Sequence, residues 1–288
     1  MAARSSSLSL GPVLPLVLSL SVSVACGPGD GDDDGGVIDS GQQIDAPMVV
    51  PDGAPIPDAA PPTPVNVIIT ADNAYGFGYG TADTMSNYFG GLEATTAGEI
   101  FNCPIGNGAE QYLVPANDAD VGNYLYIIGY ADSSTTQGVL GQFFRDGGQP
   151  VYTGQGNWEV CATGVNFSPG SGGPDLAEIN TQIGNCNAAN TDPATTSVGW
   201  VDETGTANGQ LTFGEDNSTP RNAVEVGNEF PIVCGMDPEA RWMWFNWDPA
   251  NIDWPTNGSP FIWPGGGGNP DKQFLIFRIP AEDIPIIL

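Results

Sequence analysis

From Val65 onward the chain is a succession of short runs rich in β-branched and aromatic residues, each bounded by glycine, proline, asparagine or aspartate. Runs of this length and composition are typical of β-strands joined by turns. The runs are Val65–Ala71, Asn123–Ala131, Gly138–Arg145, Trp158–Thr163, Ser197–Val201, Arg241–Trp247 and Gln273–Ile279. This pattern predicts an all-β fold.

One segment has a different periodicity. Leu176, Ile179, Ile183 and Cys186 recur at helical spacing, and a proline precedes the segment as a start signal. We therefore predict one short helix over Asp175–Asn187. Short strands with polar connections and a single helix predict a β-sandwich of the jelly-roll-like kind.

Three motifs resemble those of galactose-binding-like jelly rolls, the accessory domains found beside many glycosidases. Ala71–Tyr75 is similar to the A-D-N-x-Y strand of these domains, and Ala240–Trp244 to their A-x-W-I-W strand. The later Phe277 and Arg278 resemble the F-R pair. The resemblance implies the sandwich fold more than it implies an activity.

Residues 1–25 resemble an export signal, with Arg4 ahead of an apolar stretch from Leu8 to Val24. Prolines interrupt this stretch, and it is shorter than the ~20 apolar residues that span a bilayer. Ser23–Gly27 resembles the lipobox of bacterial lipoproteins, which implies that Cys26 is acylated and becomes the mature N-terminus. The alternative is an ordinary cleaved signal with Cys26 as a disulfide partner.

Residues 26–64 are mostly glycine, aspartate, proline and alanine with no aromatic residue. Such a composition buries too little surface to offset its ordering entropy, so we predict a disordered acidic tether. Asp30–Gly35 imitates the opening of a calcium loop, but Gly41 stands where the bidentate glutamate belongs, so an acidic spacer is the better interpretation. Residues 65–288 are predicted to form the β-sandwich domain.

The chain has 5 cysteines, and setting aside Cys26 leaves four. In an exported domain Cys103, Cys161, Cys186 and Cys234 predict two disulfides. Three connectivities are open, and sequential pairing, Cys103 with Cys161 and Cys186 with Cys234, is the simplest. No CxxC occurs, so neither a tetrathiolate zinc site nor a thioredoxin-like redox motif has support.

Charge and composition exclude several functions. There is no histidine, which rules out Ser-His-Asp and Cys-His catalysis, HExxH metalloprotease sites and His-ligated zinc. With 34 acidic against 6 basic residues the net charge is −28, so nucleic acid is a poor partner. The arginines should mostly pair with carboxylates, and Arg278, between Phe277 and Ile279, should be buried.

Aromatic residues are densest from Trp242 to Trp263. On a strand, Trp242 and Trp244 face one way while Met243 and Phe245 face the other, which indicates burial on both faces, although a partly exposed platform is the alternative. Trp254 and Trp263 lie in Pro/Gly-rich loops, where a core has less need of them. We predict these two as the ligand-binding residues.

Acidic residues gather at the ends of predicted strands, among them Asp72, Asp118, Asp120, Asp132, Asp202, Glu203, Glu215, Asp216, Asp248 and Asp253. Three uses are open: a solvated surface, one structural calcium, or an acid–base pair. No other cofactor is indicated, and no catalytic residue is assigned.

These observations predict an exported, lipid-anchored protein of the outer membrane or cell surface whose sandwich binds a ligand, carbohydrate first, or serves as surface structure. Its predicted partners are the membrane, through the lipid, and a glycan or surface component. The alternative is a secreted hydrolase that uses carboxylates. An enzyme needs converging carboxylates in a pocket, whereas a binding module needs an exposed aromatic row.

Overall fold

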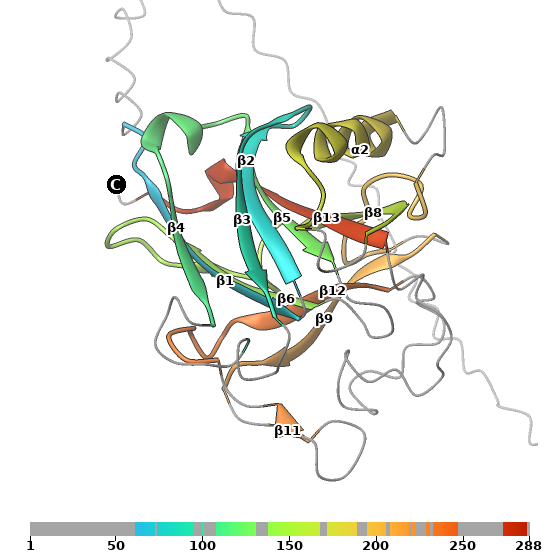
Figure 1. Ribbon diagram of the computed structural model, residues 1–288. Helices are drawn as coiled ribbons and strands as arrows, with labels where there is room; N and C mark the ends of the chain where they lie inside the picture. Colours follow the sequence, from blue (N-terminus) through green and yellow to red (C-terminus); the bar gives the residue numbers. More distant parts are fainter. Residues whose placement is uncertain are drawn as a thin grey trace, which may run out of the picture. The chain divides into compact units, whose positions relative to one another are not determined.

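The computed structural model describes residues 61–72, 74–94, 100, 108–130, 138–167, 172–188, 195–205, 208–218, 221–222, 229–230, 233–246 and 273–286. Within these ranges the chain is mostly strand (Figure 1). The strands are β1 (Val65–Asp72), β2 (Ala74–Thr81), β3 (Met85–Glu93), β4 (Glu110–Val114), β5 (Asn123–Tyr130), β6 (Gly138–Phe144), β7 (Val151–Tyr152), β8 (Glu159–Asn166), β9 (Gln210–Asp216), β10 (Arg221–Asn222), β11 (Glu229–Phe230), β12 (Arg241–Asn246) and β13 (Gln273–Pro280). The helix α2 spans Leu176–Ala188, and single 3-10 turns cover Ala116–Asp118 and Ala281–Asp283.

The strands form two antiparallel sheets. The first has the order β4-β1-β6-β12-β9, with β7 added to β6, and the second has the order β3-β2-β5-β13-β8. The short strands β10 and β11 pair with each other. Because the chain crosses repeatedly from one sheet to the other, the two sheets share one core, and the predicted β-sandwich is confirmed.

The core between the sheets follows the two-residue period of the strands. On β1, Val65, Val67 and Ile69 face this core, whereas Ile68 faces the outer side of the first sheet. On β12, Met243 and Phe245 lie between the sheets. Trp242 packs in a second cluster on the outer side. The predicted burial of this strand on both faces is therefore confirmed.

Helix α2 covers the outer face of the second sheet (Figure 1), over the strands β5 and β13. Ile179 and Ile183, at helical spacing, pack there beside Tyr126 and Ile276. Asp175 Oδ1 accepts a hydrogen bond from the Glu178 backbone N–H at 2.8 Å, as an N-cap aspartate does. The predicted helix is confirmed within one residue at each end.

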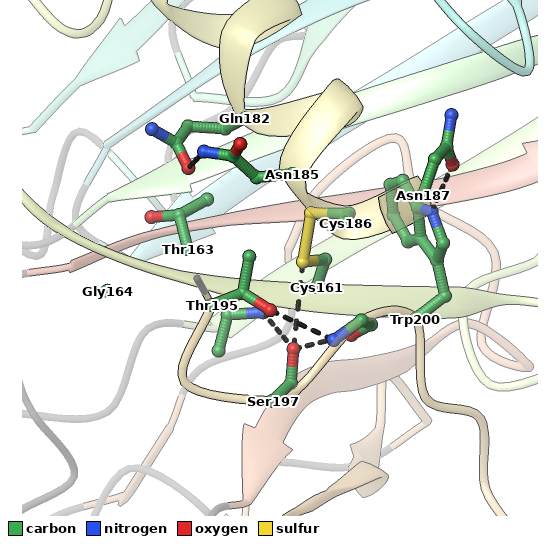
Figure 2. Close-up of a disulfide and its surroundings, with 12 residues drawn as sticks. Cys161, Thr163, Gly164, Gln182, Asn185, Cys186, Asn187, Thr195, Ser197 and Trp200 are labelled. Carbon is green, nitrogen blue, oxygen red and sulfur yellow. Dashed lines mark hydrogen bonds between the residues drawn. A yellow bond between two sulfur atoms is a disulfide. The ribbon is translucent and has the colours of Figure 1, made fainter. Parts of the chain in front are cut away.

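A disulfide ties α2 to the sheet below it. Cys186, near the end of α2, is bonded to Cys161 on β8, and Figure 2 shows the bond bridging helix and strand. The sequential pairing of the cysteines is therefore wrong, because the two middle cysteines pair with each other once the helix returns over β8. Cys234 is also disulfide-bonded. Cys26 and Cys103 lie outside the described residues.

One predicted strand is a turn in the structure, and several strands of the structure were not predicted. Ser197–Val201 is a turn with a single bridge from Val201 to Val160, because the Ser197 hydroxyl and Gly199 bond within the turn itself. Conversely, β2, β3, β4 and β9 lie outside the predicted runs. Glycine alternation conceals β2. A Cβ at Gly78 would lie 2.4 Å from the backbone oxygen of Asn87, so the β2–β3 contact requires glycine there.

Arg145 is buried at the end of β6 and is 2% exposed. Its guanidinium donates hydrogen bonds to the backbone carbonyls of Thr63, Ala119, Ala281 and Ile284. The expected carboxylate pairing does not hold for this arginine, because carbonyl oxygens satisfy its donors. Arg145 thereby joins the residues before β1 to those after β13.

Candidate functional site

A pocket of about 240 Å³ opens beside β8 and β9. Its aromatic lining residues are Tyr124, Trp158 and Phe213, its acidic ones are Glu159, Asp202 and Glu203, and Gly156, Asn157, Thr204 and Pro280 complete it. Strands of both sheets and two loops contribute to it. The pocket brings together aromatic surface and hydrogen-bonding groups, which are the two components of a small-ligand site.

The local turn fixes the carboxylate of Asp202. Its Oδ1 accepts hydrogen bonds from the Thr204 hydroxyl at 2.6 Å and from the Thr204 backbone N–H at 2.8 Å. The Thr204 hydroxyl lowers the pKa of Asp202 below its ordinary value, since these bonds favour the charged form. Asp202 is therefore an anion in a defined orientation at neutral pH.

Glu159 has a different environment. Its Oε2 accepts a hydrogen bond from Arg278 Nε at 2.7 Å, in the ion pair between neighbouring strands β8 and β13. The Arg278 guanidinium carbon lies 3.7 Å from the ring centre of Trp200 and 4.8 Å from that of Tyr124. The arginine is 8% exposed, which confirms the predicted burial. The charge of Glu159 is thus compensated from inside the protein.

The side chains of Arg278 and Trp200 both bond to the side-chain amide of Asn187. Asn187, near the end of α2, accepts a hydrogen bond on Oδ1 from Trp200 Nε1 at 2.7 Å, as Figure 2 shows, and another from Arg278 Nη1 at 3.5 Å. The disulfide one residue away fixes this end of the helix on β8. The covalent bridge therefore helps to position the arginine that pairs with Glu159.

The aromatic walls differ in what they offer a ligand. Trp158 is 1% exposed and donates its indole N–H to the Tyr152 carbonyl at 3.1 Å, so it belongs mainly to the core. Tyr124 and Phe213 are half-buried. The guanidinium carbon of Arg241 lies 5.9 Å from the Phe213 ring centre. Tyr124 and Phe213 are the aromatic side chains with surface left for a ligand.

These side chains suit binding better than acid–base cleavage. Glycoside hydrolysis by a carboxyl pair requires one carboxyl that keeps a proton to donate. Glu159 is paired with an arginine, and the pKa of Asp202 is lowered. The lowered pKa keeps Asp202 as an anion, which accepts hydrogen bonds from the hydroxyl or amine groups of a ligand, and Glu159 already has an arginine as its partner.

A second aromatic group lies where the edge strands β3 and β4 meet. The Phe89 and Tyr112 ring centres are 6.0 Å apart, and Phe89 is 40% exposed. The hydroxyls of Tyr112 and Tyr75 both donate to Glu110 Oε2, at 2.6 Å and 3.1 Å. Burial raises the pKa of both tyrosines, so the hydroxyls remain donors. These bonds hold β4 against β2, which is a structural role.

The sequence-predicted site residues fall into three groups. Trp254, Trp263, Cys26, Asp132, Asp248 and Asp253 lie outside the described residues. Asp202 and Glu203 lie together at the pocket, whereas Asp72 ends β1 and Asp118 and Asp120 precede β5. The motif residues Tyr75, Trp242 and Trp244 are all buried and serve the core.

Sequence reasoning did not single out Glu159, Tyr124 or Phe213 as site residues. They come from β8, β5 and β9, and only the pairing of strands brings them near Asp202. The one available signal was that Glu159 follows a tryptophan at the start of a predicted strand.

Metal binding gains no support from the described residues, which contain no group of three or more acidic or cysteine side chains that could hold an ion. The calcium-like run Asp30–Gly35 lies outside them. No helix in the described ranges is long and apolar enough to cross a bilayer.

Comparison of the chain with protein-family models, with curated proteins and with solved structures finds no match.

Proposed function

We propose that this chain is an exported surface protein, attached to the membrane by lipid at Cys26, whose β-sandwich binds carbohydrate at the pocket beside β8 and β9. The observation that carries the proposal is the lining of that pocket: the half-buried rings of Tyr124 and Phe213 stand beside carboxylate and amide groups. Sugar rings offer apolar faces to aromatic side chains and hydroxyls to such acceptors.

The dimensions and chemistry of the pocket support a small unit of a larger glycan. At about 240 Å³ it is smaller than the ~300–1,000 Å³ pockets that hold drug-sized ligands. The resemblance of Ala71–Tyr75 and Ala240–Trp244 to galactose-binding-like domains agrees with this ligand class. Trp254 and Trp263 remain proposed as further contacts.

A glycan array probed with the mature chain tests carbohydrate binding. Asn157 is exposed at the pocket, where its amide donates to Asp283 at 2.9 Å. Asn66 donates to Asp146 at the same distance and is not among the pocket's lining residues, so it supplies the matched control. We expect Asn157→Ala, but not Asn66→Ala, to weaken binding of the retained glycans. Binding to no glycan, or equal loss in both variants, would overturn the proposed site.

The lipid anchor has a separate test. Labelled palmitate supplied to cells that express the chain should enter the wild-type protein and not Cys26→Ser. Cell fractionation should place the wild type with the membranes and Cys26→Ser in the soluble exported fraction. Label in both proteins, or in neither, contradicts the anchor and leaves an ordinary export signal.

A further inference from the structure

The three carboxylates of the pocket are not equally compensated. Glu159 forms an ion pair with Arg278 at 2.7 Å. In the part of the chain that the structure describes, neither Asp202 nor Glu203 forms an ion pair. The Thr204 bonds hold Asp202 in its charged form. The pocket therefore keeps negative charge that no arginine of the described chain neutralises.

Aromatic rings stand beside this charge. Cations are attracted to the faces of aromatic rings, most strongly where water is partly excluded. The pocket already shows this preference, because Arg278 stacks on Tyr124 and Arg241 lies over Phe213. The combination of ring faces and uncompensated carboxylates favours a ligand that carries a positive charge on an organic frame.

A metal ion fits this pocket less well. Calcium takes six to eight oxygen ligands at about 2.3–2.6 Å. No group of three acidic side chains in the described residues is arranged to hold an ion, although three acidic residues line the pocket. A protonated amine on a sugar ring needs fewer oxygen ligands than calcium does, and the ring can contact the aromatic side chains of the same pocket.

We propose that the pocket selects sugars with a free, protonated amino group over neutral or N-acetylated sugars. This inference rests on the proposed function, because it assigns the ligand class of the same pocket. The amine would lie between Asp202 and Glu203, with the sugar ring against Tyr124 or Phe213. The net charge of −28 adds a long-range field that attracts such cations to the protein.

The test compares two tetrasaccharides that differ only at nitrogen: a β-linked glucosamine tetramer and its fully N-acetylated form. Calorimetric titration of the mature chain at low salt and mildly acidic pH, where the sugar amines are protonated and Asp202 stays ionised, should give about tenfold tighter binding of the glucosamine tetramer. Added salt should reduce that preference, because it screens the carboxylates.

Substitutions then separate the pocket from the general charge of the protein. Asp202→Asn and Glu203→Gln should each weaken binding of the glucosamine tetramer more than binding of the N-acetylated tetramer, and so remove most of the preference for the amine. Asp175→Asn removes the same charge at the exposed start of α2, where asparagine also caps a helix, and should change nothing.

The outcomes distinguish the two proposals. Equal affinity for both tetramers, changed in parallel by Asn157→Ala, overturns the amine preference and keeps carbohydrate binding. An amine preference that falls equally in Asp175→Asn and in the pocket variants reflects non-specific attraction to a polyanion and also overturns the inference. Binding of neither tetramer, nor of any glycan on the array, overturns both proposals.

Discussion

Arg278 and Glu159 lie directly opposite each other on β13 and β8, and their side chains meet in an ion pair of 2.7 Å. The pair joins the outer, α2-covered face of the second sheet to the pocket. Arg278 is buried between two aromatic rings, whereas the Glu159 side chain is 37% exposed at the pocket. One end of the interaction is therefore structural and the other is available to a ligand.

This asymmetry predicts that substituting Arg278 lowers the free energy of unfolding more than substituting Glu159 does. Arg278→Ala removes stacking on Trp200 and Tyr124 as well as the ion pair, and should lower the free energy of unfolding by about 2–4 kcal/mol. Glu159→Gln keeps the shape and a hydrogen-bond acceptor beside the arginine, and should cost about 1 kcal/mol or less because the site is partly solvated. Denaturant unfolding measures both. Equal costs would contradict a buried role for the arginine.

Arg278→Lys is the informative control for this pair. Lysine keeps the charge but lacks the planar guanidinium that stacks on Trp200, so it should recover only part of the stability lost in Arg278→Ala. Full recovery by lysine would mean that charge alone matters at this position.

The strands that the sequence predicted contain more apolar side chains than β2, which it missed. Segments such as β1, β5 and β13 are buried on both faces and appear as continuous apolar runs. Strand β2 is also buried, but glycine occupies three of its eight positions, Gly76, Gly78 and Gly80, because β3 approaches its backbone closely. Glycine lowers the strand signal of a segment that the tertiary contact makes a strand.

The pocket was less accessible to sequence reasoning than the fold. Asp202 and Glu203 were recognised as an acidic pair, but their neighbours Tyr124, Glu159 and Phe213 come from strands far apart in the chain. Strand order within a sandwich is set by the whole topology and not by local pattern. The sequence can therefore indicate which residues end strands, but not which ends meet.

The disulfide pattern gives a second prediction. Cys161 and Cys186 are 25 residues apart, and closing a loop of that size stabilises a domain by about 3 kcal/mol. The double variant Cys161→Ala with Cys186→Ala should lose about that much. It should also weaken glycan binding, since the bridge holds the end of α2 that positions Asn187 and Arg278. Unchanged stability would contradict a structural role for the bridge.

The partner of Cys234 can be identified directly. Cys234 is disulfide-bonded, and acylation of Cys26 would leave Cys103 as its partner. We expect mass spectrometry of a non-reduced digest to recover linked peptides for Cys161 with Cys186 and for Cys103 with Cys234. Pepsin suits the digest, because the chain has only 6 lysines and arginines and acid suppresses thiol exchange. A Cys26–Cys234 peptide would contradict both this pairing and the lipid anchor.

A third prediction separates the tryptophans of the core from Trp254 and Trp263, which lie in the Pro/Gly-rich sequence after β12. Trp244 on β12 is 4% exposed, so Trp244→Ala should destabilise the domain by about 3–5 kcal/mol. Trp254→Ala and Trp263→Ala should leave the melting temperature nearly unchanged and weaken glycan binding. If Trp254→Ala or Trp263→Ala unfolds as readily as Trp244→Ala, that tryptophan is a core residue and not a ligand contact.

The last prediction concerns stability at alkaline pH. Burial raises the pKa of Tyr126 to about 12, and its hydroxyl donates to the Thr81 carbonyl. Burial likewise raises the pKa of Tyr130 to about 12. An unfolded tyrosine has a pKa near 10, so between about pH 10 and pH 12 the unfolded chain binds fewer protons than the folded one. The free energy of unfolding should therefore be constant with respect to these groups below pH 10 and fall as the pH rises above it.

Tyr126→Phe tests this directly. The variant should lose about 1 kcal/mol near neutral pH, for the missing hydrogen bond, and its stability should then fall less steeply than that of the wild type above pH 10, by about 1.4 kcal/mol per pH unit for one group. Urea unfolding followed by tryptophan fluorescence at a series of pH values measures both effects. Equal slopes for the two proteins above pH 10 would show that the Tyr126 hydroxyl is not held protonated by burial between β5 and α2.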